Sequence, residues 1–162
     1  MVKIKWWGHA CFSLILNEET NIVTDPYNEE LPYEQVDDQV DIVTVSHDHF
    51  DHNAINRLLG KPKVVNTIDG FSNDQINITG FSTYHDESKG NERGTNIIYL
   101  MDIAGVKICH LGDLGHSLND KQVRKLTETD ILLVPVGGYY TIDAEKAYQI
   151  TQQIKPKLII PM

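Results

Sequence analysis

The sequence predicts a layered fold of the α/β or α+β type, in which helices cover β-sheets. The first half of the chain holds short apolar runs bounded by Gly, Asn, Asp and Pro, a pattern typical of strands and turns. The second half alternates helical and strand patterns, and residues 130–136 form a nearly continuous apolar run, which indicates a strand buried on both faces. A chain of 162 residues without a linker or an internal repeat is expected to form a single domain over residues 1–162.

The first half is expected to begin with four strands. They fall at residues 3–7, 11–16, 21–24 and 41–46. Residues 17–21 form a polar hairpin turn, and the acidic segment 26–39 is expected to be a loop. Residues 52–59 carry apolar side chains at helical spacing that stop at Gly60, so they predict a short helix.

The second half continues with strands and then two helices. The strand candidates are residues 63–67, 75–79 and 81–84, a hairpin at 96–102 and 106–110, and a last strand at 157–160. Residues 85–95 contain no apolar side chain and are expected to be a loop. Residues 119–127 and 144–154 have amphipathic spacing, which predicts helices. The second helix has acidic residues near its start, where the helix dipole favours them.

Composition and charge exclude several classes of protein. The chain is 41% hydrophobic and 23% charged, which excludes intrinsic disorder, and no apolar run is long enough for a transmembrane helix. The first residues lack the apolar core of a signal peptide. The net charge of −9 argues against nonspecific electrostatic binding of nucleic acid or anionic lipid, but it does not exclude a local basic groove. Cys11 and Cys109 form no CxxC pair and are expected to be buried free thiols, which favours a cytoplasmic location.

The histidines carry the clearest chemical signal. Three of the seven fall within six positions, in His47-Asp48-His49-Phe50-Asp51-His52, directly after the strand candidate 41–46. Alternate side chains at a strand end lie on the same side, so His47 and His49 are expected to converge on one point. Asp51 and His52 then address a second point as the chain turns into the expected helix. Imidazole and carboxylate together are the ligands of Zn, Fe or Mn rather than of Ca or Mg, so the segment predicts a metal site.

Two further strand ends offer metal ligands. His85 follows the strand candidate 81–84. Asp113 follows the strand candidate 106–110, after Gly112, which permits a close approach of the backbone. His85 is a candidate to complete the first site, and Asp113 is a carboxylate that can bridge two metals.

These motifs resemble the metallo-β-lactamase superfamily, whose signature is H-x-H-x-D-H. Within it, the chain is similar to the branch of metal-dependent hydrolases that includes the ascorbate-6-phosphate lactonases and the N-acyl phosphatidylethanolamine phospholipases D. The matching segments beside the metal motif are Trp7-Gly8-His9-Ala10, Val23-Thr24-Asp25-Pro26, His85, His110-Leu111-Gly112-Asp113 and Val134-Pro135-Val136-Gly137-Gly138. The resemblance implies an α/β fold, a four-layer αββα sandwich of the metallo-β-lactamase type.

The resemblance also implies a site with two divalent metal ions, Zn²⁺ in the first place and Mn²⁺ or Fe²⁺ as alternatives. The first metal is held by His47, His49 and His85, the second by Asp51 and His52, and Asp113 bridges them. The family has one more histidine for the second metal, just after a strand like the one that ends this chain at Met162. We therefore expect a C-terminally truncated domain without its final strand and helix, an incomplete second metal site and an exposed apolar edge.

The implied reaction is hydrolysis. A metal-bound hydroxide attacks an ester, lactone, amide or phosphodiester, and the acidic composition favours a small-molecule substrate over nucleic acid. Asp51, Asp113 and His116 are the candidate catalytic residues. One alternative is a nuclease or phosphodiesterase that acts on nucleic acid, and another is a metal-binding fragment without catalysis. Neither the substrate nor the oligomeric state follows from the sequence.

Several residues near these motifs have two interpretations. His9 either supports the site or is an ordinary structural histidine. His116 either has a role in the site, by reaching the substrate or acting as an acid, or is an ordinary loop histidine. Asp25 is expected to accept a hydrogen bond from a ligand histidine, with a simple turn as the alternative. His110 is expected to pack within its strand.

Two loops also have two interpretations. Residues 137–141, which start with a pair of glycines, either bind an anionic group through backbone N–H groups or form a tight turn. The loop 85–95 contains Lys89 and Arg93 and is either a lip beside the substrate or a solvated loop.

Overall fold

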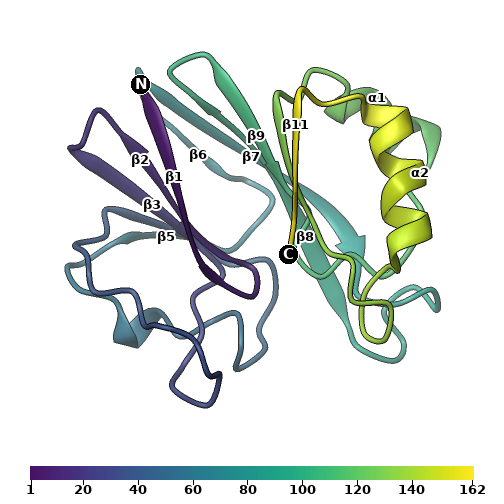
Figure 1. Cartoon of the computed structure of the whole chain (residues 1–162), viewed down its shortest axis with the longest axis horizontal. Helices are drawn as coiled ribbons and strands as arrows, with labels where there is room; N and C mark the ends of the chain where they lie inside the picture. Colours follow the sequence, from purple (N-terminus) through teal and green to yellow (C-terminus); the bar gives the residue numbers. More distant parts are fainter. The chain divides into compact units, whose positions relative to one another are not determined.

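A computed structural model describes all residues 1–162, and the chain divides into two compact units, Met1–Thr67 and Ile68–Met162. Each unit is built on its own β-sheet (Figure 1). The single-domain organisation expected from the sequence remains a prediction.

The first unit contains a five-stranded sheet with the order β1-β2-β3-β4-β5. Its strands are β1 (Val2–Gly8), β2 (Cys11–Leu16), β3 (Thr20–Thr24), β4 (Ile42–Thr44) and β5 (Lys63–Val65). β1 and β3 pair antiparallel with β2, whereas β4 pairs parallel with both β3 and β5. The carboxyl ends of β3 and β4 therefore meet at one edge of the sheet, which brings Asp25 and the segment after Thr44 together.

The core of this unit gathers around the end of β1 and the loop that follows β3. Trp7, Cys11, Val23, Tyr27 and Val40 are buried together there. The Tyr27 hydroxyl lies 2.6 Å from the backbone carbonyls of both Trp7 and Glu34, and its one proton is shared between them, which attaches the acidic loop to the sheet. The loop that leads from β3 to β4 is thus anchored near the ends of the strands that carry the candidate ligands.

The second unit contains a six-stranded sheet with the order β11-β10-β9-β8-β7-β6. Its strands are β6 (Phe71–Ser72), β7 (Ile76–Tyr84), β8 (Thr95–Ile103), β9 (Val106–His110), β10 (Ile131–Val134) and β11 (Leu158–Pro161). β8 pairs antiparallel with β7 and with β9, so β7 and β9 run in the same direction, and β10 is parallel to β9 and β11. The carboxyl ends of β7, β9 and β10 consequently lie at the same edge of this sheet.

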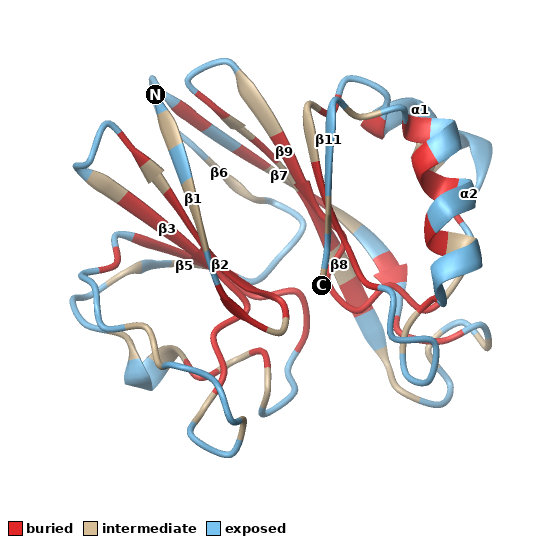
Figure 2. Ribbon diagram, viewed as in Figure 1, coloured by how far each residue is buried: buried red, intermediate tan, exposed pale blue.

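Two helices pack on the second sheet, α1 (Asp120–Leu126) and α2 (Ala144–Ile154) (Figure 1). Asn119 and Gln122 form a capping box at the start of α1, and Asp143 accepts a hydrogen bond from the Lys146 N–H at the start of α2. The buried side of α2 is visible in Figure 2, and its residues Ala147, Ile150 and Ile154 join the same hydrophobic cluster as strand residues of β8, β9 and β10. This packing holds the segment between β10 and α2 over the edge where β7 and β9 end.

Most of the predicted strands and both later helices are confirmed, with small shifts in their bounds. Two predictions are wrong. Residues 52–59 form no α-helix but a single 3-10 turn, Ile55–Arg57, because the Ala54 N–H donates to the Pro26 carbonyl instead of to a helical partner. Residues 75–79 and 81–84 are not two strands but parts of β7, since Gly80 stays in the ladder opposite Tyr99.

Three further expectations can be compared with the fold. Cys11 and Cys109 are free and buried, as expected, and burial raises the pKa of both thiols. The last strand, β11, forms an edge of its sheet, and its Leu158 and Ile159 are 50% and 44% exposed, which matches the expected apolar edge. None of the helices has the length and apolarity needed to cross a membrane.

Candidate metal centre

The histidine motif lies just beyond the carboxyl end of β4 and folds into a tight loop. The His49 carbonyl accepts hydrogen bonds from the N–H groups of both His52 and Asn53, so the chain reverses between the second and third histidines. The ring centroid of His47 is 4.4 Å from that of His49 and 4.2 Å from that of His52. His47 and His52 are buried and His49 is exposed. The first unit therefore brings the three predicted histidine ligands together.

Asp25 is the buried carboxylate that organises this loop. It is fully buried at the end of β3, with a left-handed backbone (φ 37°). Its Oδ1 accepts from the Ser46 N–H at 2.7 Å, and its Oδ2 accepts from the Ser46 hydroxyl at 2.5 Å and from His52 Nδ1 at 2.9 Å. The hydrogen bond that Asp25 was expected to accept from a candidate ligand histidine is thus present.

The Asp25 hydrogen bonds also decide which nitrogen of two rings carries the proton. A carboxylate only accepts, so His52 donates from Nδ1. The Ser46 hydroxyl has one proton, which it gives to Asp25, so it accepts from His47 Nδ1 at 2.8 Å. Both histidines consequently present Nε2 as the nitrogen with a lone pair, which is the atom that would bind a metal.

A second cluster in the same unit contains Asp51, His9 and His52. His9 sits in the turn between β1 and β2 with a φ of 49°, and its Nε2 lies 3.2 Å from Asp51 Oδ2. One ligand atom from each of His9, Asp51 and His52 lies within 4.8 Å of the others. Burial opposes the ionisation of Asp51, but the hydrogen bond from His9 and the electrostatic effect of His52 outweigh it and lower the pKa of the carboxyl. His9 thus contacts a predicted ligand.

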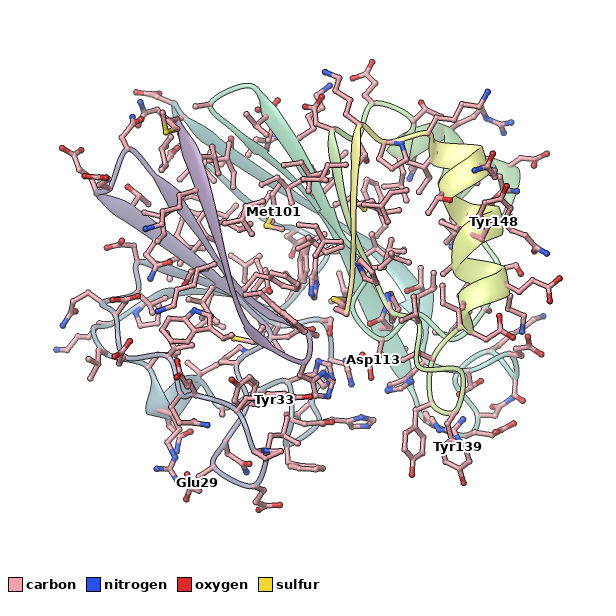
Figure 3. All side chains as sticks on the ribbon, viewed as in Figure 1. Glu29, Tyr33, Met101, Asp113, Tyr139 and Tyr148 are labelled. Atoms are coloured by element: carbon pink, nitrogen blue, oxygen red, sulfur yellow. The ribbon has the colours of Figure 1, made fainter.

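The second unit places His85 and Asp113 at the shared edge of its sheet. His85 directly follows β7, and Asp113 lies beyond the end of β9 (Figure 3). His85 Nδ1 donates to the Tyr140 carbonyl at 3.0 Å, because a carbonyl oxygen has no proton to give. His85 Nε2 then lies 3.2 Å from Asp113 Oδ2. The sequence correctly predicted both side chains at strand ends, and the two strands are separated in the sheet by β8.

The contact between His85 and Asp113 bears directly on cation binding. A neutral His85 with its proton on Nδ1 would direct a lone pair at a carboxylate oxygen, and two acceptors at this distance repel unless a proton or a metal ion lies between them. Burial lowers the pKa of His85, but the hydrogen bond and the negative charge of Asp113 outweigh it, so the pKa is raised. The donor set of imidazole nitrogens and carboxylates in both units fits a transition-metal ion.

Asn96 holds the backbone of Asp113, and Gly115 packs against the backbone of His85 and Asp86. Neither role was expected from the sequence. The buried Asn96 side chain accepts from the Asp113 N–H at 3.0 Å and donates to Thr83 Oγ1 and to the Leu111 carbonyl. Gly115 lies so close to the backbone of His85 and Asp86 that an added Cβ would be 2.3 Å from it. An asparagine within a strand and a glycine in a loop give no sequence signal of their own, because their roles depend on contacts between strands.

His116 and His110 have their ring environments set by the second unit. His116 Nε2 accepts from the Tyr84 N–H at 3.2 Å, and its Nδ1 donates to the Ser117 carbonyl at 2.8 Å. Protonation of Nε2 would break the first of these bonds, so a role as an acid requires the loop to move; the catalytic role of His116 remains a prediction. His110 is fully buried in β9, as expected.

Replacement of Asp25 by asparagine tests its control of the histidine rings. In Asp25→Asn the amide must present an N–H group to one of three donors, so we expect metal affinity to fall about 10- to 100-fold and stability to fall by about 1–3 kcal/mol. Competition with a chromophoric chelator and urea unfolding measure the two effects. The control is Asp48→Asn in the same loop, where the exposed carboxylate accepts from Asn53 Nδ2. Equal metal affinity in the two variants would contradict the assignment.

Replacement of Gly115 by alanine tests the close packing beneath His85. The new Cβ must push apart the backbones of the two loops, so we expect Gly115→Ala to destabilise the protein by about 1–3 kcal/mol. Gly137→Ala is the matched control, since its Cβ would meet only the Thr141 side chain at 3.3 Å and neither glycine has a positive φ. Thermal unfolding of both variants is the measurement. If Gly115→Ala were as stable as Gly137→Ala, the close packing of Gly115 would not contribute to stability, and the prediction would be wrong.

Comparison with known proteins gives a consistent family assignment. The profile of the beta-lactamase superfamily domain matches residues 3–162. A UPF0173 metal-dependent hydrolase of Thermoplasma volcanium is 32% identical to the chain, over 99% of this chain and 82% of the relative. A second one, from Staphylothermus marinus, is 31% identical over 100% of this chain and 83% of the relative.

A solved structure extends this match to the fold. A protein of Thermotoga maritima, described as a candidate Zn-dependent hydrolase of the metallo-β-lactamase superfamily, is 39% identical to the chain, with a TM-score of 0.83. The match covers 100% of this chain and 75% of that protein, and it confirms the fold class expected from the sequence. The chain belongs to the β-lactamase superfamily and, within it, to the UPF0173 metal-dependent hydrolase family.

Proposed function

We propose that the protein is a metal-dependent hydrolase that uses two divalent metal ions to cleave an ester, lactone, amide or phosphodiester in a small molecule. Zn²⁺ is the metal we propose first, with Mn²⁺ or Fe²⁺ as alternatives. The observation that carries the proposal is the state of the histidine rings. Three candidate ligands, His47, His52 and His85, donate from Nδ1 to an acceptor of the protein, which leaves Nε2 as the metal-binding nitrogen of each. The names of the relatives as metal-dependent hydrolases agree with it.

The proposed ligand set follows the resemblance residue by residue. His47, His49 and His85 would hold one ion, Asp51 and His52 would hold the other, and Asp113 would be a ligand of both. The grouping of His47, His49 and His52 within the first unit supports this set, and so does the contact between His85 and Asp113 within the second.

Each residue has a defined task in this proposal. When bound, two divalent ions supply Lewis acidity and lower the pKa of water at the site towards 7. Asp25 and Ser46 orient the rings of His47 and His52, and the Tyr140 carbonyl orients His85. Asp51 stays ionised because of His9 and His52, which suits a ligand for a cation.

The substrate and the cellular location belong to the proposal as well. The net charge of −9 favours a small molecule over nucleic acid, because phosphate backbones are attracted by basic surfaces. Two buried free cysteines are typical of proteins in a reducing compartment, which supports a cytoplasmic location.

Removal of one exposed ligand tests the function. The protein is loaded with zinc, its metal content is measured by mass spectrometry, and hydrolysis is followed with chromogenic esters, lactones, amides and phosphodiesters. Loss of a residue that only orients a metal ligand lowers activity up to about 100-fold. We expect His49→Ala to lower the rate of hydrolysis by more than this, because it removes a proposed ligand itself. Phe50→Ala is the control, since this neighbouring side chain is 59% exposed and has no ligand atom.

Two results would reject the proposal. One is a wild-type protein that retains no stoichiometric transition metal. The other is a wild-type protein whose hydrolysis of the panel is unchanged in His49→Ala. Cleavage of nucleic acid in preference to every small molecule would instead favour the nuclease alternative.

A further inference from the structure

Two loops of the second unit, which lie about 50 residues apart in sequence, form one cavity. The cavity has a volume of about 290 Å³. The loop after β7 contributes Asp86, Glu87, Ser88, Glu92 and Arg93, and the segment between β10 and α2 contributes residues 138–141. Gly115 and Lys146 complete the lining. A space of this size accommodates a small chemical group rather than a macromolecule.

The first of these loops is held in one conformation by a buried carboxylate. Asp86 accepts hydrogen bonds from the N–H groups of Gly90, Glu92 and Arg93 at 2.8, 3.1 and 2.9 Å. Burial opposes its ionisation, but these bonds outweigh burial and lower the pKa of the carboxyl. An ion pair between Glu87 and Lys146 ties the loop to α2. The backbone that carries Arg93 is therefore fixed before any ligand arrives.

Arg93 has the side chain best suited to bind a ligand in this cavity. Its guanidinium carbon lies 4.9 Å from the centroid of the Tyr140 ring, which holds it in a stacked position. Its one ion pair, with Glu92, is 3.7 Å long, beyond hydrogen-bond distance, and 30% of the Arg93 side chain is exposed. A guanidinium has five N–H donors in a planar fork that matches the oxygens of a carboxylate or a phosphate.

The acidic residues of the cavity are already committed to other partners. Glu87 pairs with Lys146, and Asp86 accepts from the loop backbone. Glu92 accepts from the Ser88 hydroxyl through Oε1, and its side chain is 59% exposed, so water can take over its weak contact with Arg93. An oxyanion that enters the cavity therefore competes only with Glu92 for Arg93.

The cavity adjoins a proposed metal ligand. Tyr140 stacks on Arg93 with its ring and accepts from His85 Nδ1 with its backbone carbonyl. Asp86 follows His85 directly, and Gly115 packs against the backbone of both residues. Tyr139, which is 77% exposed, projects outward from the same segment and forms an edge-on contact with Tyr140 (Figure 3). A group bound by Arg93 would thus sit next to the residue that is proposed to hold the metal.

We propose that this cavity recognises an anionic group of the substrate, a carboxylate or a phosphate, through the guanidinium of Arg93 stacked on Tyr140. The proposal rests on the proposed hydrolase function and narrows its substrate to small molecules with such a group at a distance from the bond that is cleaved.

The test compares two variants that each remove one positive charge from the same loop. Arg93→Gln removes the proposed anchor, and Lys89→Gln removes an exposed charge that does not line the cavity. Zinc-loaded wild type and variants are titrated with succinate and, separately, with inorganic phosphate, by calorimetry and by amide chemical shifts. We expect Arg93→Gln to weaken binding of at least one of these ions about tenfold or more, and Lys89→Gln to leave it unchanged. The ion that loses affinity identifies the group as carboxylate or phosphate.

Turnover gives a second readout. With 4-nitrophenyl hemisuccinate, an anionic ester, we expect Arg93→Gln to raise KM, whereas the neutral 4-nitrophenyl butyrate is expected to react equally with wild type and variant. Three results would overturn the proposal. Wild type and Arg93→Gln could bind anions with equal affinity, Lys89→Gln could lose as much anion affinity as Arg93→Gln, or wild type could bind no anion. Anion binding that depends on Arg93 in a protein without hydrolase activity would reject the proposed function, whereas activity that depends on His49 but not on Arg93 would reject only the cavity assignment.

Discussion

The buried carboxylate of Asp25 is the constraint on which the arrangement of the first unit depends. A carboxylate removed from water is costly unless hydrogen bonds replace its hydration. Asp25 receives three, from the Ser46 N–H, the Ser46 hydroxyl and His52. These bonds fix the backbone at the end of β4, the tautomer of His52 and, through the Ser46 hydroxyl, the tautomer of His47. One charge at the end of β3 thereby leaves the Nε2 atoms of two candidate ligands without a proton, on the loop that follows β4.

The second unit reaches the same result with different acceptors. Its strands β7, β9 and β10 end at one edge, and the segments beyond them contribute His85, Asp113 and Tyr140. The Tyr140 carbonyl accepts the Nδ1 proton of His85, as Asp25 accepts that of His52 in the first unit. Asn96 holds the backbone of Asp113. Because the Tyr140 segment also stacks on Arg93, the proposed orientation of a metal ligand and the proposed binding of an anionic group involve the same short loop.

The sequence predicted the parts of the site that depend on strand periodicity and on residue chemistry. The histidine motif at the end of β4, a hydrogen bond from one candidate ligand histidine to Asp25, and the placement of His85 and Asp113 after strands all follow from such patterns. Ser46, Asn96 and the Tyr140 carbonyl could not be predicted, because serine, asparagine and backbone atoms acquire these tasks only through tertiary contacts. The expected helix over residues 52–59 failed for the same reason: the Ala54 N–H bonds to Pro26, so a tertiary contact replaced a helical hydrogen bond.

The proposed function requires the proton to lie on Nδ1 of His47, His52 and His85, so that Nε2 of each ring is available to a metal ion. Long-range ¹H–¹⁵N NMR of the zinc-loaded protein, with ¹⁵N-labelled histidine, measures this directly for each ring. We predict Nδ1–H in all three residues and a metal-shifted Nε2 resonance. A metal-shifted Nδ1 in any of the three, or rings whose spectra do not respond to zinc, would contradict it.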